Sequence, residues 1–333
     1  MRAVRPLLRS TPHHLFPNSA HAPHTHRTRS AHAPVHLTRF SSRSSTAAVA
    51  AAVRALLNHT SAPAYPMASG IANMGGATLD LAGGIYQISA PVVVPTFVGN
   101  VRIGGGGTLR AGPSFPADRH LIEIGGVKTG AGACVPKDGQ KVCNEFVTIS
   151  DVFLDAAHVA AGGVHVAMTM GTTVTNSFVT GFHGAGILVD DGHETMVTDC
   201  WLAEYYWSEK HEKSACAAHF PSTKWTAGSV GITINGEDNL VTDVIIFDFT
   251  CVGVLVNGAA TLLTGVHSWN GGGVAISING TYDVQDRVVD CYLDYSVLKI
   301  VNPLFVLVQG NFFYETHTKL VGPVTQLVMR ENT

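Results

Sequence analysis

The chain has 333 residues, of which 46% are apolar and only 14% are charged, so it has ample material for one large folded core. Glycine is abundant at 35 residues, which favours short strands joined by tight turns. No apolar run reaches the roughly 18 residues of a membrane span, so we expect no membrane partner.

Charge is divided unevenly along the chain. Residues 1–45 contain seven arginines and no acidic residue, and the first carboxylate is Asp80. The remainder carries 14 basic against 24 acidic side chains, a balance of −10. Because the chain after residue 45 is mildly acidic, we expect no basic surface that binds the phosphates of a nucleic acid and therefore no nucleic-acid partner. An anionic substrate would therefore need a local basic patch.

The first 45 residues are rich in Arg, His, Ser and Pro, which indicates a disordered tail or an organellar targeting segment. The apolar pair Leu7-Leu8 is too short for the core of a secretory signal. A misassigned translation start is another interpretation. We place the folded domain at residues 46–333.

Thr46–Leu57 is the one clear helical segment, and Ser45 or Thr46 is in position to cap it. Its small apolar residues cover most faces, which indicates that it packs against another element. A helix at this point would cover the first open rung of a repeating β structure.

From about Gly75, short β runs recur at a fixed interval. An apolar-threonine pair recurs at spacings of 23, 44 and 22 residues, in the sequences that begin at Val174, Val197, Val241 and Leu263. An Asx-Gly pair recurs in phase with it at spacings of 44, 22 and 22, at Asp191, Asn235, Asn257 and Asn279. Helical or leucine-rich repeats and β-sandwiches do not produce this spacing.

A period of about 22 residues is typical of one coil of a parallel β-helix, with three short strands and three turns. The 44-residue spacing then represents one coil with an insertion. The sequence therefore predicts an all-β fold, a single-stranded right-handed parallel β-helix with an N-terminal capping helix. The chain stops at Val328–Thr333 within this pattern, so a truncated C-terminus is a further expectation.

None of the six cysteines shows zinc-type spacing. Cys134 and Cys143 bracket a polar loop and could form a small disulfide. Cys200, Cys251 and Cys291 lie inside apolar runs, which predicts buried free thiols.

Five segments of the β region resemble the quartet-type plant polygalacturonases, which belong to the pectin-lyase-like superfamily. They are GGATLDLAGGIYQIS (75–89), GGTLRAGPSFPADRHLIEI (106–124), GHET (192–195), NLVTDVIIF (239–247) and CYLDYSVLKIVNP (291–303). The resemblance covers roughly residues 75–333. It implies hydrolysis of α-1,4 bonds in homogalacturonan, an acidic polysaccharide of the cell wall, by a secreted protein that needs no cofactor. We also expect a monomer.

The sequence departs from the usual polygalacturonase set of Asn-x-Asp, Asp-Asp, Gly-His-Gly and Arg-x-Lys. Asp190-Asp191 is followed directly by Gly192-His193-Glu194, and neither Gly-His-Gly nor Arg-x-Lys occurs. Residue roles therefore cannot be taken from the resemblance.

Stacked coils place equivalent residues about 4.8 Å apart. If Asp191-Gly192 lies over Asn235-Gly236, His193 lies beside Glu237 and Glu194 beside Asp238. Crowded carboxylates favour one protonated member, and an inverting glycosidase needs two carboxyl groups about 6.5–9.5 Å apart. The predicted catalytic residues are Asp190, Asp191, His193, Glu194 and Asp238.

In this hypothesis Asp190 or Asp191 is the base, Glu194 or Asp238 is the acid, and His193 orients or shuttles the proton. Two other interpretations stay open. Asp and Asn before Gly are common turn formers because they tolerate the left-handed conformation, and Asp199 and Asp243 are expected only to decorate a turn. An acidic cluster could also bind Ca²⁺.

The insertion at residues 204–228 combines aromatic and basic side chains that could stack on sugar rings and pair with uronate carboxylates. The predicted substrate-binding residues are Tyr206, Trp207, Lys210, His211, Lys224 and Trp225. The alternative is a loop whose aromatics pack inward.

The sequence thus favours a hydrolase of pectic polygalacturonan that acts by acid–base catalysis with inversion. The alternatives are a catalytically degenerate carbohydrate-binding β-helix and a pectate lyase, and Ca²⁺ would be a cofactor only for the lyase. The resemblance predicts secretion to the cell wall. The N-terminal segment without acidic residues instead favours targeting to an organelle or a misassigned translation start.

Overall fold

The computed structural model describes residues 35–36, 45–57, 67, 70–125, 134, 142–203, 229–247, 251–269, 273–280 and 285–333. Residues 32–333 form one compact unit, and the other unit, Met1–Ala31, has no described residue. The predicted boundary at residue 45 stays a prediction. No helix in the described ranges has the length and hydropathy that a membrane span requires.

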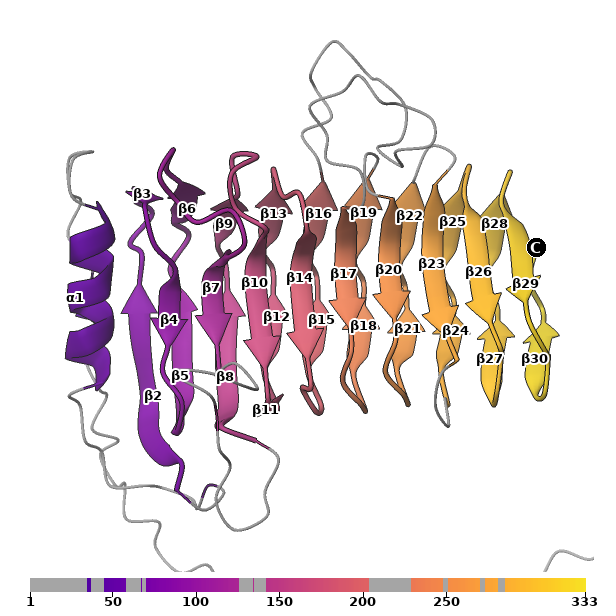
Figure 1. The fold of residues 1–333 in the computed structure, drawn as a ribbon, viewed down its shortest axis with the longest axis horizontal. Helices are drawn as coiled ribbons and strands as arrows, with labels where there is room; N and C mark the ends of the chain where they lie inside the picture. The colour runs from indigo at the N-terminus through magenta and orange to yellow at the C-terminus, as the bar shows by residue number, and fades with distance from the viewer. Residues whose placement is uncertain are drawn as a thin grey trace, which may run out of the picture. The chain divides into compact units, whose positions relative to one another are not determined.

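Three parallel sheets run along residues 70–333, and each coil contributes one strand to each of them (Figure 1). Sheet A contains β1 (Val35–His36), β2 (Ala72–Asp80), β5 (Val98–Gly104), β8 (Asn144–Ser150), β12 (Thr173–Thr175), β15 (Met196–Thr198), β18 (Leu240–Thr242), β21 (Leu262–Thr264), β24 (Arg287–Val289), β27 (Val306–Gln309) and β30 (Leu327–Arg330), with β11 (Thr169–Met170) paired to β8.

Sheet B contains β3 (Ile85–Ile88), β6 (Thr108–Ala111), β9 (Phe153–Asp155), β13 (Phe178–Thr180), β16 (Trp201–Ala203), β19 (Ile245–Phe247), β22 (His267–Trp269), β25 (Tyr292–Asp294) and β28 (Phe312–Tyr314). Sheet C contains β4 (Val92–Val94), β7 (His120–Ile124), β10 (Gly162–Ala167), β14 (Ala185–Asp190), β17 (Val230–Ile234), β20 (Val252–Val256), β23 (Val274–Asn279), β26 (Val297–Val301) and β29 (His317–Val321).

The repeat predicted from the sequence is the stacking repeat of sheet A. Val174 pairs with Val197, Val197 with Val241, and Val241 with Leu263 in consecutive parallel strands. The 44-residue spacing arises because residues 204–228 fall between β16 and β17. The predicted parallel β-helix is therefore confirmed.

The core lies between the three sheets because side chains alternate along each strand. Val174, Val179 and Ile187, one from each sheet in a single coil, are fully buried at 0% exposure. The flanking residues of these short strands are mostly half-buried, so one side chain per short strand usually carries the packing. Replacing such a residue by alanine is expected to cost about 2–5 kcal/mol.

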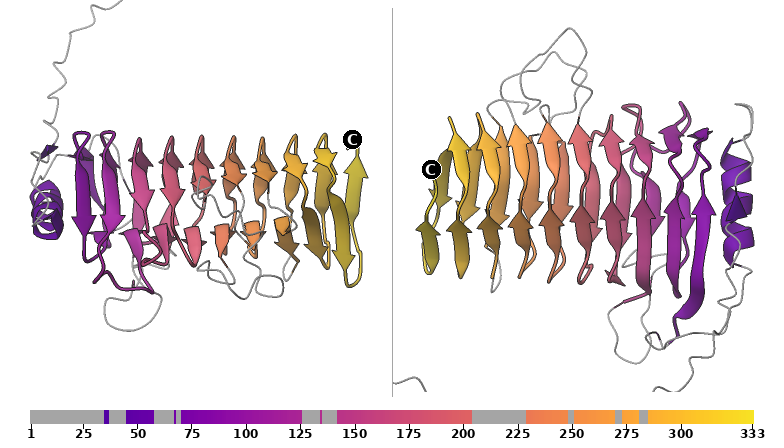
Figure 2. Two further views of the ribbon diagram at one scale, coloured as in Figure 1. Left: turned by 90° about the horizontal axis from the view of Figure 1, so that it is seen from above. Right: turned by 180° about the vertical axis from the view of Figure 1, so that it is seen from behind.

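Helix α1 (Ser45–Leu57) packs against β2, β3 and β4, the three strands of the first coil, and also against β1 (Figures 1 and 2). Val49 and Ala52 join the main core at 2% and 7% exposure. The predicted capping of the β-helix is confirmed. Both predicted caps, Ser45 and Thr46, lie within α1, and the prediction is wrong for Thr46, because its hydroxyl accepts a hydrogen bond from the Ser89 amide at 2.8 Å.

The corner from sheet A to sheet B is a tight turn with one left-handed residue. Asp151, Asn176, Asp199 and Asp243 have φ values of 57°, 44°, 51° and 51° in four successive coils. Asp and Asn tolerate this conformation better than most residues, which explains their recurrence. The prediction that Asp199 and Asp243 occupy a turn is confirmed.

The cysteines behave as predicted at all positions but one. Cys134 and Cys143 form a disulfide with a Cα–Cα distance of 6.2 Å, within the normal range. Cys200 and Cys291 are buried free thiols, and burial raises the pKa of Cys200 to about 11 and that of Cys291 to about 12. Cys251 is disulfide-bonded, so its prediction as a free thiol is wrong, and its partner lies outside the described residues.

Candidate functional site

The corner from sheet C to sheet A carries the Asx-Gly pairs. A Cβ atom on Gly236 would overlap the carbonyl oxygen of Gly192, and one on Gly258 would overlap that of Gly236. Glycine is needed in this stack because successive backbones approach too closely for any side chain. The three glycines therefore lie over one another, as the 22-residue period predicts.

His193 lies beside Glu237, to which it is joined by a parallel bridge, as predicted. The next residues, Glu194 and Asp238, both adopt positive φ, at 48° and 57°, and both side chains are exposed. The corner therefore brings three carboxylates and one imidazole of two neighbouring coils together. We refer to His193, Glu194, Glu237 and Asp238 as the acidic corner.

The asparagines of the corner have a different role from the predicted one. Asn235, Asn257 and Asn279 are not among the residues with positive φ. Instead Asn279 donates to Asn257 at 2.7 Å, and Asn257 donates to Asn235 at 2.9 Å. Asn235 in turn donates to Asp190 Oδ1 at 3.5 Å. These residues are therefore a side-chain hydrogen-bond ladder across four coils, and left-handed tolerance does not explain them.

Asp190 ends β14 on the outward face of sheet C, because its neighbour Val189 is buried in the core. His165 lies on the same face, one coil earlier, and Glu123 pairs with His165 from the coil before that. Burial lowers the pKa of His165, while the negative charges of Glu123 and Asp190 act in the opposite direction. The Nε2 atom of His165 is buried without a hydrogen-bond partner in the described part of the chain.

The carboxylate of Glu123 is fixed by its own strand. Arg119 donates to it through Nε at 2.7 Å and through a second guanidinium nitrogen, and the His120 amide donates at 3.2 Å. The His120 ring lies 5.3 Å from that of His165. Burial lowers the pKa of His120 to about 3, so its ring is neutral and its Nε2 donates to the Ala185 carbonyl at 3.0 Å. We refer to Arg119, Glu123 and His165 as the sheet C triad.

Sequence reasoning missed the sheet C triad, although it is one coil from Asp190. Glu123 and His165 are 42 residues apart because residues 126–141 lengthen that coil, so no 22-residue spacing marks them as neighbours. Two lysines, Lys299 and Lys319, pair on the same sheet in later coils. Sheet C therefore carries cationic groups that the mean charge of the body does not reveal.

The predicted substrate-binding residues of the insertion, Tyr206, Trp207, Lys210, His211, Lys224 and Trp225, lie outside the described residues. The described residues that flank the insertion are Ala203 at the end of sheet B and Ser229 before sheet C. Within the described ranges, no three His, Cys, Asp or Glu side chains are close enough together to hold a metal ion.

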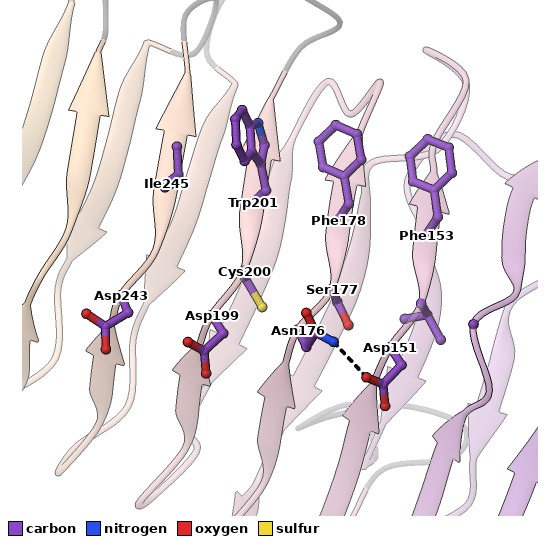
Figure 3. Close-up of a pocket in the computed structure, with 12 residues that line it drawn as sticks. Asp151, Phe153, Asn176, Ser177, Phe178, Asp199, Cys200, Trp201, Asp243 and Ile245 are labelled. Carbon is purple, nitrogen blue, oxygen red and sulfur yellow. Dashed lines mark hydrogen bonds between the residues drawn. The ribbon is translucent and has the colours of Figure 1, made fainter.

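A shallow groove of about 620 Å³ follows the corner from sheet A to sheet B across four coils (Figure 3). One side is the row of left-handed residues Asp151, Asn176, Asp199 and Asp243. The other side is formed by the first residues of the sheet B strands, which lie in register as Phe153, Phe178, Trp201 and Ile245. We call this the A–B groove. Its carboxylates make it a poor site for an anionic sugar.

A curated relative decides the family. The chain is 34% identical over 256 residues to Polygalacturonase QRT3 of Arabidopsis thaliana. The match covers 73% of this chain and 47% of that protein. The protein is a homologue of the quartet-type plant polygalacturonases. It spans about half the length of that relative, and no family model matches it.

A solved structure with little sequence identity agrees with the fold of this polygalacturonase homologue. ORF18 of Geobacillus virus E2 superposes with a TM-score of 0.55 at 11% identity, over 88% of this chain and 60% of the viral one. The DFA-IIIase of Arthrobacter chlorophenolicus A6 without its lid gives a TM-score of 0.47 at 10% identity, over 90% of this chain and 93% of that one. At such identities the likeness concerns the fold alone.

Proposed function

We propose that this polygalacturonase homologue hydrolyses the α-1,4 bonds of pectic polygalacturonan by acid–base catalysis with inversion and without a cofactor. The observation that carries the proposal is the bridge between His193 and Glu237, which sets two acid-bearing coils side by side. Homology to a polygalacturonase supports the reaction class.

Asp190 or Asp191 serves as the base that activates water, and Glu194 or Asp238 serves as the acid that protonates the leaving oxygen. His193 orients or shuttles the proton. Residues in adjacent coils are about 4.8 Å apart, and a sideways step adds to that, so the pair can reach the separation of about 6.5–9.5 Å that inversion needs.

The substrate is anionic, so its binding requires positive charge near the acids. Lys299 and Lys319 lie on β26 and β29 of sheet C, four and five coils beyond β14 with Asp190, and Arg119 directly precedes β7 of the same sheet. Of these, Lys299 and Lys319 have no ion pair with another described residue and are free to meet uronate carboxylates. The aromatic and basic residues of the insertion are proposed to contribute further sugar contacts.

We also propose a monomer that is secreted to the cell wall. The disulfide between Cys134 and Cys143 and the bonded state of Cys251 support an oxidising compartment. Mass spectrometry of the mature N-terminus tests this location, because retention of residues 1–45 or an organellar cleavage would contradict secretion.

The decisive assay is the release of reducing ends from polygalacturonate, with and without a chelator. Hydrolysis that the chelator leaves unchanged supports the proposal. Unsaturated, ultraviolet-absorbing products that the chelator abolishes would indicate a Ca²⁺-dependent lyase. Binding of polygalacturonate without any product would indicate a carbohydrate-binding protein, and either of these last results overturns the proposal.

A further inference from the structure

The A–B groove has the composition of a sugar-binding surface. The rings of Phe153 and Phe178 are stacked with centroids 5.0 Å apart, and Phe178 meets Trp201 edge-on at 6.3 Å. Trp201 keeps 39% of its surface exposed, which is unusual for so large an apolar side chain. Trp201 is also stacked on Phe247 with centroids 5.0 Å apart, so the exposed remainder of the Trp201 ring is the part that can pack against the C–H face of a sugar ring.

The opposite side of the groove offers acceptors for hydroxyl groups. Asp151 is already engaged, because Asn176 donates to it at 2.7 Å and Arg102 pairs with it at 3.0 Å, and the Asn176 bond lowers the pKa of Asp151. Among the described residues, Asp199 and Asp243 accept hydrogen bonds only from the hydroxyls of the threonines that precede them, at 3.0 and 3.2 Å. Both side chains are exposed, and Figure 3 shows them in a row that runs alongside the aromatic row.

The charge of the groove decides which sugar it can take. Neither Asp199 nor Asp243 forms an ion pair with any described cation. A uronate carboxylate in the groove would therefore meet uncompensated negative charge, whereas a neutral hydroxyl would donate a charge-assisted hydrogen bond. The four coils span about 14 Å, which suits a chain of several sugar rings.

We infer that the A–B groove is a second glycan site, specific for a neutral, hydroxyl-rich oligosaccharide. It lies at the corner between sheets A and B, whereas the acidic corner lies between sheets C and A. The two sites would recognise opposite kinds of sugar, so the protein would hold a neutral wall polymer while sheet C engages the acidic one. The inference does not depend on catalysis, because it concerns binding.

Isothermal titration calorimetry on the full chain tests the inference with cellohexaose, a β-1,4-galactohexaose and hexagalacturonate. The first two ligands distinguish between glucan and galactan as the source of the neutral chain. We expect one neutral hexasaccharide to bind, and Trp201→Ala to weaken that binding about tenfold or more. Phe312→Ala is the matched control, because Phe312 occupies the equivalent register position four coils further on and should leave Kd unchanged.

The double variant Asp199→Asn, Asp243→Asn tests the charge argument without altering the turn, since Asn tolerates left-handed φ as Asp does. The double variant should bind the neutral hexasaccharide about three- to tenfold more weakly than wild type and should bind hexagalacturonate more tightly. A Trp201→Ala protein that binds the neutral sugar as wild type does, or no binding of either neutral hexasaccharide, overturns the inference. If the wild-type protein binds a neutral hexasaccharide but does not hydrolyse polygalacturonate, that result contradicts only the proposed function.

Discussion

Asp286 Oδ1 accepts a hydrogen bond from the Thr261 amide at 2.9 Å, one coil away, while its Oδ2 is buried with no partner among the described residues. Two coils earlier, Asn239 accepts from the Thr195 amide at the same distance. The position therefore requires an acceptor, and at Asp286 that acceptor is a carboxyl group at 1% exposure. Burial raises its pKa from 3.8 to about 6.

Because the folded pKa of Asp286 lies above its unfolded value, this group contributes stability below about pH 4 that is lost as the pH rises through about 6. The Asp286→Asn variant should lack this loss and be more stable than wild type at pH 7, by on the order of 3 kcal/mol. Urea unfolding at pH 4, 5, 6 and 7 measures the difference. Equal pH dependence in both proteins would show that Asp286 ionises freely in the fold.

Amide substitution tests the proposed catalytic roles. Asp191→Asn and Asp238→Asn should each lower kcat on polygalacturonate about 100-fold or more, because a general base or acid is removed while the size is kept. Glu194→Gln and Asp190→Asn complete the series. Asp290→Asn is the control, since Asp290 has the same left-handed turn conformation, with φ of 52°, lies outside both the acidic corner and the A–B groove, and should retain full activity. Wild-type rates in all four amide variants, at Asp190, Asp191, Glu194 and Asp238, would refute the assignment.

Asn257 lies in the middle of the side-chain ladder, where it both donates to Asn235 and accepts from Asn279. Asn257→Ala should destabilise the fold by about 2 kcal/mol, since two half-buried hydrogen bonds are lost. Thr264→Ala, a half-buried position in the next coil of sheet A, should change stability by less than about 0.5 kcal/mol. Chemical denaturation compares the two, and a neutral Asn257→Ala change would mean that water replaces the ladder.

The glycine stack gives a direct test of coil packing. Gly236→Ala should lower the free energy of unfolding by at least about 2 kcal/mol, because its Cβ would overlap the Gly192 carbonyl. Gly112→Ala is a milder change, with its nearest neighbours at 3.2 Å, and should cost less. Thermal unfolding that ranks the two variants in the opposite order would contradict the stacking of Gly192 and Gly236.

The sequence by itself determined the architecture. Alternating apolar residues and a 22-residue interval can be read directly from the chain. They indicate coils of three short strands without any knowledge of which residues are in contact. For the same reason the pairing of Val197 with Val241 and of His193 with Glu237 could be predicted from spacing alone.

Only the tertiary structure decided which side chains meet where the spacing is irregular. Glu123 and His165 became neighbours because the loop between them does not alter the stacking of β7 on β10. The structure also assigned Asn257 to a ladder and separated the A–B groove from the acidic corner. Sequence spacing reports contacts between coils only when the interval is close to a multiple of the repeat, whereas backbone hydrogen bonding between stacked strands fixes those contacts whatever the loops contain.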